Sequence, residues 1–87
     1  MRIDSEPAWS PDGKQIAFIH GSSEPRVSGI YLIEANGNNR HQIHTGTAGG
    51  LSWSPDGEWI VYTETYDTGR LWLMRPDGSE KRQLTYE

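Results

Sequence analysis

The sequence predicts an all-β fold made of two tandem copies of one four-stranded unit. The pentapeptide Trp-Ser-Pro-Asp-Gly occurs at residues 9–13 and again at residues 53–57. The 87 residues include ten Gly and five Pro, only 33% are hydrophobic, and no segment has the pattern of a long helix. This composition is typical of a β protein rich in turns. A motif repeated at such a distance indicates that each copy is one small unit of supersecondary structure.

The match between the copies extends well beyond the pentapeptide. A step of 44 residues takes Trp9 to Trp53 and Ile16 to Ile60, whereas residues 29–43 align with residues 70–84 at a step of 41. The second copy therefore lacks three residues in the loop between its second and third strands. We expect a first unit at residues 1–44 and a second at residues 45–87.

Each unit divides into four short strands. The first strand ends at the Trp, and the others are expected at residues 14–20, 29–35 and 40–45 in the first copy and at 58–65, 70–76 and 81–87 in the second. Asp-Gly pairs at 12–13, 56–57 and 77–78, and the Asn-Gly pair at 36–37, predict tight hairpin turns. The Asp side chains are expected to close their own turns, in preference to metal or acid chemistry.

The second and third strands of each unit carry apolar residues at successive positions, as in residues 16–19 and 71–74. Neighbouring side chains on a strand point to opposite faces, so such a sheet is apolar on both faces. Four-stranded sheets of this kind, each covered by copies of itself, are the blades of a β-propeller. A propeller has about four to eight blades, and this chain supplies two, so we expect oligomerisation to complete the ring. Trp9 and Trp53 are expected to pack between blades.

The motif segments resemble the TolB-type propeller repeat, in residues 7–18 and again in residues 53–85. Where that repeat usually has Leu-Thr, the first copy has Ile43-His44. The resemblance implies a six-bladed ring and hence a homotrimer. A fourfold ring of eight blades and a piece of a longer propeller remain open. It also implies protein or peptide binding at the cell envelope, in the periplasm, although the chain shows no export signal and its compartment is not determined.

Charge and motifs exclude several function classes. The net charge is −4 with no run of basic residues, which argues against nucleic acid as a partner. No apolar run approaches the ~20 residues that span a membrane, so we expect no membrane insertion. Three histidines, His20, His41 and His44, are too scattered over the predicted strands to suggest a metal site. We expect no cofactor, no metal and no catalytic residue, because no sequence motif of an enzyme is present.

Any binding surface is expected at the channel mouth, where the loops between second and third strands and between blades meet. Residues 45–50, which include three of the ten glycines, are interpreted as a linker between the blades. The candidate partner-facing residues in these loops are Glu24, Arg26, His44, Tyr66, Asp67 and Arg70.

Three functions are compatible with these features. The favoured one is a non-enzymatic module that self-assembles from copies of itself, with ends typical of an engineered or recently duplicated block. The alternatives are a TolB-like protein- or peptide-binding domain and the propeller part of a hydrolase.

Overall fold

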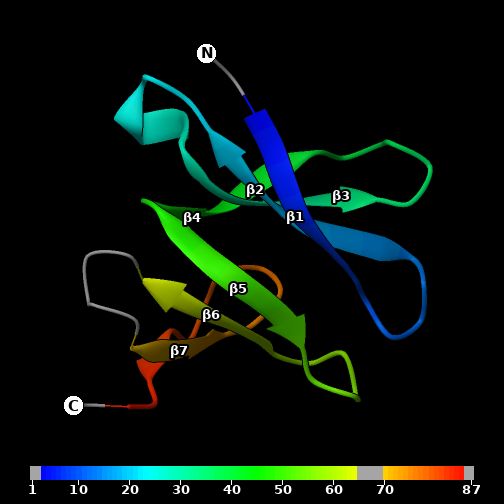
Figure 1. The fold of residues 1–87 in the computed structure, drawn as a ribbon. Coiled ribbons are helices and arrows are strands. Elements are labelled where there is room, and N and C mark those ends of the chain that lie inside the picture. Colours follow the sequence, from blue (N-terminus) through cyan, green and yellow to red (C-terminus); the bar gives the residue numbers. More distant parts are fainter. Residues whose placement is uncertain (1–2, 65–69, 86–87) are drawn as a thin grey trace.

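The computed structural model describes residues 3–64 and 70–85 as two four-stranded antiparallel sheets. The first contains β1 (Ile3–Trp9), β2 (Gln15–Gly21), β3 (Gly29–Glu34) and β4 (His41–Thr45), and a 3₁₀ turn, η1 (Pro25–Val27), lies between β2 and β3. The second contains β5 (Ala48–Trp53), β6 (Ile60–Glu64), β7 (Leu71–Met74) and β8 (Arg82–Gln83). In both sheets each strand pairs with the next in the chain, as in a propeller blade (Figure 1). The predicted all-β architecture is confirmed, although β8 is shorter than expected.

The turns after β1 and β5 have the same construction. Asp12 accepts hydrogen bonds from the Ser10 hydroxyl at 2.6 Å and from the backbone N–H of Lys14 at 2.9 Å. Asp56 accepts from Ser54 at 2.5 Å and from the N–H of residue 58 at 3.0 Å. Asp77 likewise accepts from the hydroxyl and N–H of residue 79. The prediction that these carboxylates close their own turns is confirmed, and these bonds lower the pKa of all three.

A β-bulge interrupts the inner strand of each sheet at equivalent positions. The register with the neighbouring strand shifts between Ser5 and Ala8 in the first sheet and between Gly49 and Ser52 in the second. Glu6 and Gly50 occupy the two bulges, with φ of 51° and 62°. Only Gly adopts this backbone conformation without steric cost. Residues 48–50 are therefore part of strand β5, and the interpretation of residues 45–50 as a linker was wrong: only residues 46 and 47 lie between β4 and β5.

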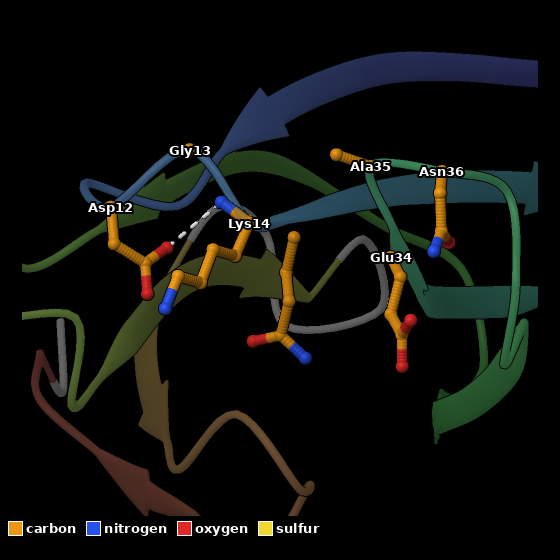
Figure 2. Close-up of a pocket in the computed structure, with 7 residues that line it drawn as sticks. Asp12, Gly13, Lys14, Glu34, Ala35 and Asn36 are labelled. Carbon is orange, nitrogen blue, oxygen red and sulfur yellow. Dashed lines mark hydrogen bonds between the residues drawn. The ribbon is translucent and has the colours of Figure 1, made fainter.

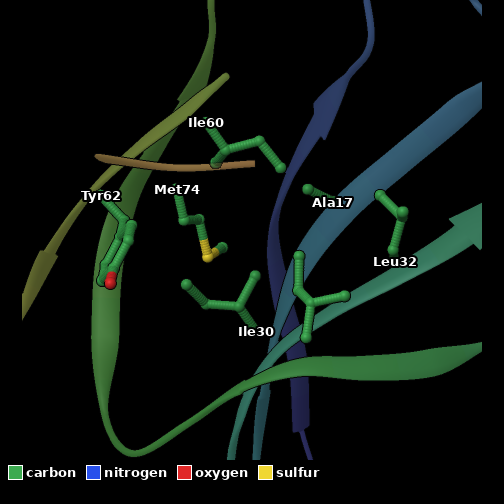
Figure 3. Packing of buried hydrophobic residues seen from close by; sticks show 7 residues of the cluster. Ala17, Ile30, Leu32, Ile60, Tyr62 and Met74 are labelled. Carbon is green, nitrogen blue, oxygen red and sulfur yellow. The ribbon is translucent and has the colours of Figure 1, made fainter. Parts of the chain in front are cut away.

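The hydrophobic core lies between the two sheets (Figure 3). Each sheet contributes the buried residues on the face that it turns toward the other sheet. The cluster consists of Ala17, Ile30, Leu32, Ile43, Ile60, Tyr62 and Met74. One face of each sheet is thus buried against the other sheet, while the opposite faces carry further apolar side chains.

The two repeated tryptophans have different environments. Trp53 packs against the core, and its indole N–H donates a 2.9 Å hydrogen bond to the carbonyl of Ala8 in the first sheet. Trp9 is 59% exposed. The expectation that both pack between blades is confirmed for Trp53 and stays a prediction for Trp9, because it concerned a completed ring.

Candidate functional site

The loop between β2 and β3 and the connection between β4 and β5 lie on the same side of the molecule (Figure 1). The turns after β1, β3 and β5 lie on the opposite side. We call residues 22–28 and 45–47 the loop surface. It includes two of the predicted partner-facing residues, Glu24 and Arg26, and both are exposed.

Ser28 organises the loop surface from beneath. It is only 6% exposed, its hydroxyl accepts the N–H of Ser22 at 2.9 Å, and it donates to the Ser22 carbonyl at 2.9 Å. The Ser28 carbonyl accepts the N–H of Gly46 at 2.9 Å, which ties the loop to the connection between the blades. The Tyr31 hydroxyl adds a 2.7 Å bond to the carbonyl of Val27. These bonds fix the backbone, so Glu24 and Arg26 project from an ordered turn.

His44 occupies a different environment from these exposed side chains. It is 8% exposed, packs against the Tyr62 ring at 4.8 Å, and places Nε2 2.5 Å from a carboxylate oxygen of Glu64. Burial lowers the pKa of His44 below its usual 6.5, although the Glu64 carboxylate acts in the opposite direction. Burial likewise raises the pKa of Tyr62 to about 12. His44 thus contributes to packing between the blades and is not available to a partner on the loop surface.

A bulge explains why His44 is buried. Gln42 pairs with Tyr31 and His44 pairs with Ile30, so β4 has one residue more than β3 in this interval. The extra residue turns both Ile43 and His44 away from solvent, whereas strict alternation would bury only one of them. A bulge of this kind has no clear signature in a single sequence.

The remaining predicted residues divide between described and undescribed parts of the chain. Tyr66 and Asp67 lie outside the described residues. Arg70 is described, half-buried immediately before β7, and has interactions of its own. The structure therefore brings Glu24 and Arg26 together on one loop and separates His44 from them.

Sequence reasoning missed a charged cluster on the outer face of the first sheet. His20 Nδ1 lies 2.6 Å from Asp4 Oδ1, and the guanidinium of Arg40 lies 3.5 Å from the same oxygen. Arg40 also lies over the rings of Phe18 and Tyr31, 5.4 Å and 4.6 Å from their centroids. The direct pairing of residues 4 and 20 on neighbouring strands could have suggested the Asp–His contact, but Arg40 comes from a loop whose path no local pattern predicts.

A shallow groove of about 530 Å³ lies between the turn that joins β1 to β2 and the turn after β3 (Figure 2). Its lining includes Asp12, Lys14, Glu34 and Asn36. Asp12 is already hydrogen-bonded to the N–H of Lys14, and the groove lies on the side opposite the loop surface.

Within residues 3–64 and 70–85, no group of three or more His, Asp or Glu side chains lies close enough together to hold a metal ion. The same residues contain no helix of the length and apolarity needed to cross a membrane.

Comparisons with known proteins identify the repeat. TolB, a Tol-Pal system protein of Alcanivorax borkumensis, is 35% identical over 63 residues, which cover 70% of this chain. The solved structure of a protein assigned as TolB from Agrobacterium tumefaciens aligns with all of this chain with a TM-score of 0.78 and 26% identity. This chain consists of two tandem TolB-type β-propeller blades.

Two further relatives of these TolB-type blades do not carry the name TolB. YuxL of Bacillus subtilis, an uncharacterized peptidase, is 35% identical over 95% of this chain, and the uncharacterized protein Atu1656 of Agrobacterium fabrum is 33% identical over 88%. The chain spans 14%, 12% and 27% of TolB, YuxL and Atu1656, and 31% of the solved structure. No family model matches the sequence.

Proposed function

We propose that these TolB-type blades belong to a propeller that binds a protein or peptide through the loop surface and catalyses no reaction. The compartment that we propose is the cell envelope, since the TolB relatives are proteins of a Tol-Pal system. The observation that carries the proposal is the ordered loop around Ser28, which projects Glu24 and Arg26 from a fixed backbone. A loop that is ordered before binding loses less conformational entropy when a partner docks.

Opposite charges two residues apart on one exposed loop suit a partner that offers both an acceptor and a donor. Arg is common among the residues that dominate binding energy at interfaces, because its planar guanidinium forms paired hydrogen bonds. Glu24 and Arg26 flank Pro25, the first residue of η1, so the two side chains are presented by one rigid turn. Arg26 is therefore the residue on which we expect affinity to depend most.

The test measures binding of purified Tol-Pal system components to the chain by isothermal titration calorimetry. Arg26→Ala is expected to weaken binding by about tenfold or more, equivalent to ~1.4 kcal/mol. Ser28→Ala, which touches no partner but releases the loop, is expected to weaken it through lost order. Lys14→Ala, a cation on the opposite side of the molecule, is the matched control and should bind normally. Unchanged binding by Arg26→Ala and Ser28→Ala would rule out the loop surface.

The match to YuxL supports a second candidate, in which the blades form the propeller part of a hydrolase. On this proposal the chemistry would depend on residues outside these two blades. Activity of the longer protein on esters, lactones or peptides, abolished by changes outside residues 1–87 and modulated by Arg26→Ala, would support it. Background rates on all three substrate classes would eliminate it.

The predicted self-assembly into a ring, with a homotrimer as its simplest form, stays a prediction, as does an engineered or recently duplicated origin. The similarity to natural TolB proteins supports protein binding, and not ring formation alone, as the principal function.

A further inference from the structure

The internal repeat supplies a direct comparison between covered and uncovered faces. In the first blade, Ile30 and Ile43 face the second blade and are 0% and 6% exposed. A step of 41 residues takes them to Leu71 and Leu84, which are 38% and 45% exposed. The outer face of the second blade thus carries apolar residues at the positions that the first blade buries, and residues 3–64 and 70–85 leave them partly exposed.

The outer face of the first blade is its counterpart. Trp9 is equivalent to Trp53 at a step of 44 residues, and Trp53 inserts against the preceding blade and bonds to the Ala8 carbonyl. The same step takes Ala8 to Ser52, so the equivalent acceptor for Trp9 is the carbonyl of Ser52 in another copy. Beside it, a groove of about 280 Å³ includes Ile16, Phe18 and Ile33 in its lining.

Close backbone contacts between the blades obey the same comparison. A Cβ atom on Gly78 would lie 2.3 Å from the carbonyl oxygen of Ile43, and one on Gly57 would lie 3.7 Å from Pro11. The equivalent glycines of the first blade, Gly37 and Gly13, have no atom within 4 Å of such a Cβ position. Gly13 and Gly37 therefore lack a side chain at the positions where a neighbouring blade would come close, and the space beside them is open.

We propose that the outer face of the first blade binds the outer face of the second blade in a second copy of this chain. Leu71 and Leu84 of one copy would then pack over the groove of the other, and Trp9 would donate its indole N–H to the Ser52 carbonyl. The argument for a second copy is that each face is equivalent, residue by residue, to one half of the interface already formed between the blades. Because the two faces differ, the contact is head-to-tail and either closes into a ring or extends as a filament.

Two differences make the contact between copies weaker than the contact between the blades of one chain. Within the chain, Glu6 accepts a hydrogen bond from the N–H of Gly50 at 2.9 Å. In the contact between copies, Gly50 takes the place of Glu6 and has no side chain that could accept the equivalent hydrogen bond. The contact between His44 Nε2 and the Glu64 carboxylate has Thr85 and His20 at the equivalent positions, which do not include a carboxylate. We therefore expect assembly to depend on concentration, in the micromolar range or above.

The first measurement is the mass of the native chain by light scattering at roughly 100 µM, well above a micromolar dissociation constant. The proposal expects a multiple of the 9.8 kDa chain mass, and a six-bladed ring corresponds to three chains, about 29 kDa. A monomer at this concentration overturns the proposal, whether circular dichroism shows it folded or unfolded. The two faces would then need an occupant other than a second copy of the chain.

The second measurement separates a head-to-tail contact from a symmetric one. Trp9→Glu blocks only the first-blade face, and Leu84→Glu blocks only the second-blade face; both side chains are exposed in the single chain, so folding should tolerate the changes. Each variant alone is expected to be monomeric. An equimolar mixture is expected to form a dimer of about twice the chain mass and nothing larger, since only one functional face of each kind remains.

The control is Ser23→Glu, which adds the same charge at an exposed loop position away from both faces and should assemble as the native chain does. Assembly of either blocked variant alone, or failure of the mixture to dimerise while Ser23→Glu assembles, would overturn the proposal. The experiment is independent of binding at the loop surface, so its result and that of the Arg26→Ala titration can be distinguished.

Discussion

The repeat allows one residue of the core to be compared with its own exposed equivalent. Ile30 and Leu71 occupy the same position in their blades, yet Ile30 is fully buried between the sheets and Leu71 is partly exposed. We expect Ile30→Ala to destabilise the chain strongly and Leu71→Ala to destabilise it slightly, in a dilute sample where copies do not associate.

The expected magnitude follows from burial. Ile30→Ala removes three carbon atoms from a fully buried site, and ~0.8 kcal/mol for each gives about 2.4 kcal/mol. The cavity left behind raises the total to roughly 3–4 kcal/mol. Leu71→Ala also removes three carbon atoms, but Leu71 is 38% exposed, so the loss is about 1.5 kcal/mol, without the cavity contribution of a closed site. Ile30→Val, expected to cost roughly 0.5–1.5 kcal/mol, provides a milder change in case the alanine variant unfolds.

The assay is urea unfolding followed by tryptophan fluorescence, with the free energy of unfolding taken from the midpoint and slope. It is performed at low micromolar concentration and repeated at roughly 100 µM. If Leu71→Ala costs as much as Ile30→Ala in the dilute sample, the outer face of the second blade must be covered within the chain, and the assignment of open faces is refuted. A larger cost of Leu71→Ala at the high concentration is expected if copies associate.

Two further outcomes follow from contacts between the blades. Burial places the pKa of His44 below 6.5, so the unfolded chain takes up the proton first as the pH falls. The stability that neutral His44 provides is therefore present above about pH 6.5 and is lost below it. His44→Gln should flatten the dependence of the unfolding free energy on pH between about 7 and 5. A slope unchanged in His44→Gln would refute this assignment. Gly78→Ala should destabilise by about 1–3 kcal/mol more than Gly37→Ala by thermal unfolding, since both positions have positive φ but only Gly78 meets a backbone carbonyl, and equal losses would contradict that contact.

Local patterns in the sequence were sufficient for the elements and their order. The repeated pentapeptide located the turns, because Ser and Asp side chains bond to backbone only a few residues away. Runs of successive apolar residues predicted sheets that are apolar on both faces, and the exposed Leu84 and the groove beside Phe18 agree with that prediction. The hydrogen bonds in these turns join residues that are close in the sequence, so the spacing of residues is enough to predict them.

The candidate site was predicted less completely. Glu24 and Arg26 were found because an extended polar loop between two apolar strands must lie at the surface. His44 was assigned to the same loops, but a bulge in β4 shifts its register and buries it. The role of Ser28 was missed, because its hydroxyl bonds to the backbone of Ser22, six residues earlier, only when the loop folds back on itself.

The sequence by itself determined the order of the strands, the turns and the presence of two blades in this chain, because each depends on the order of apolar, polar and glycine residues over a few positions. Only the tertiary structure decided that Trp53 is covered while Trp9 is not, and that Ile30 is buried while Leu71 is exposed. The members of each pair sit in equivalent local patterns. What separates them is the presence or absence of a neighbouring blade, and burial depends on that neighbour and not on local sequence.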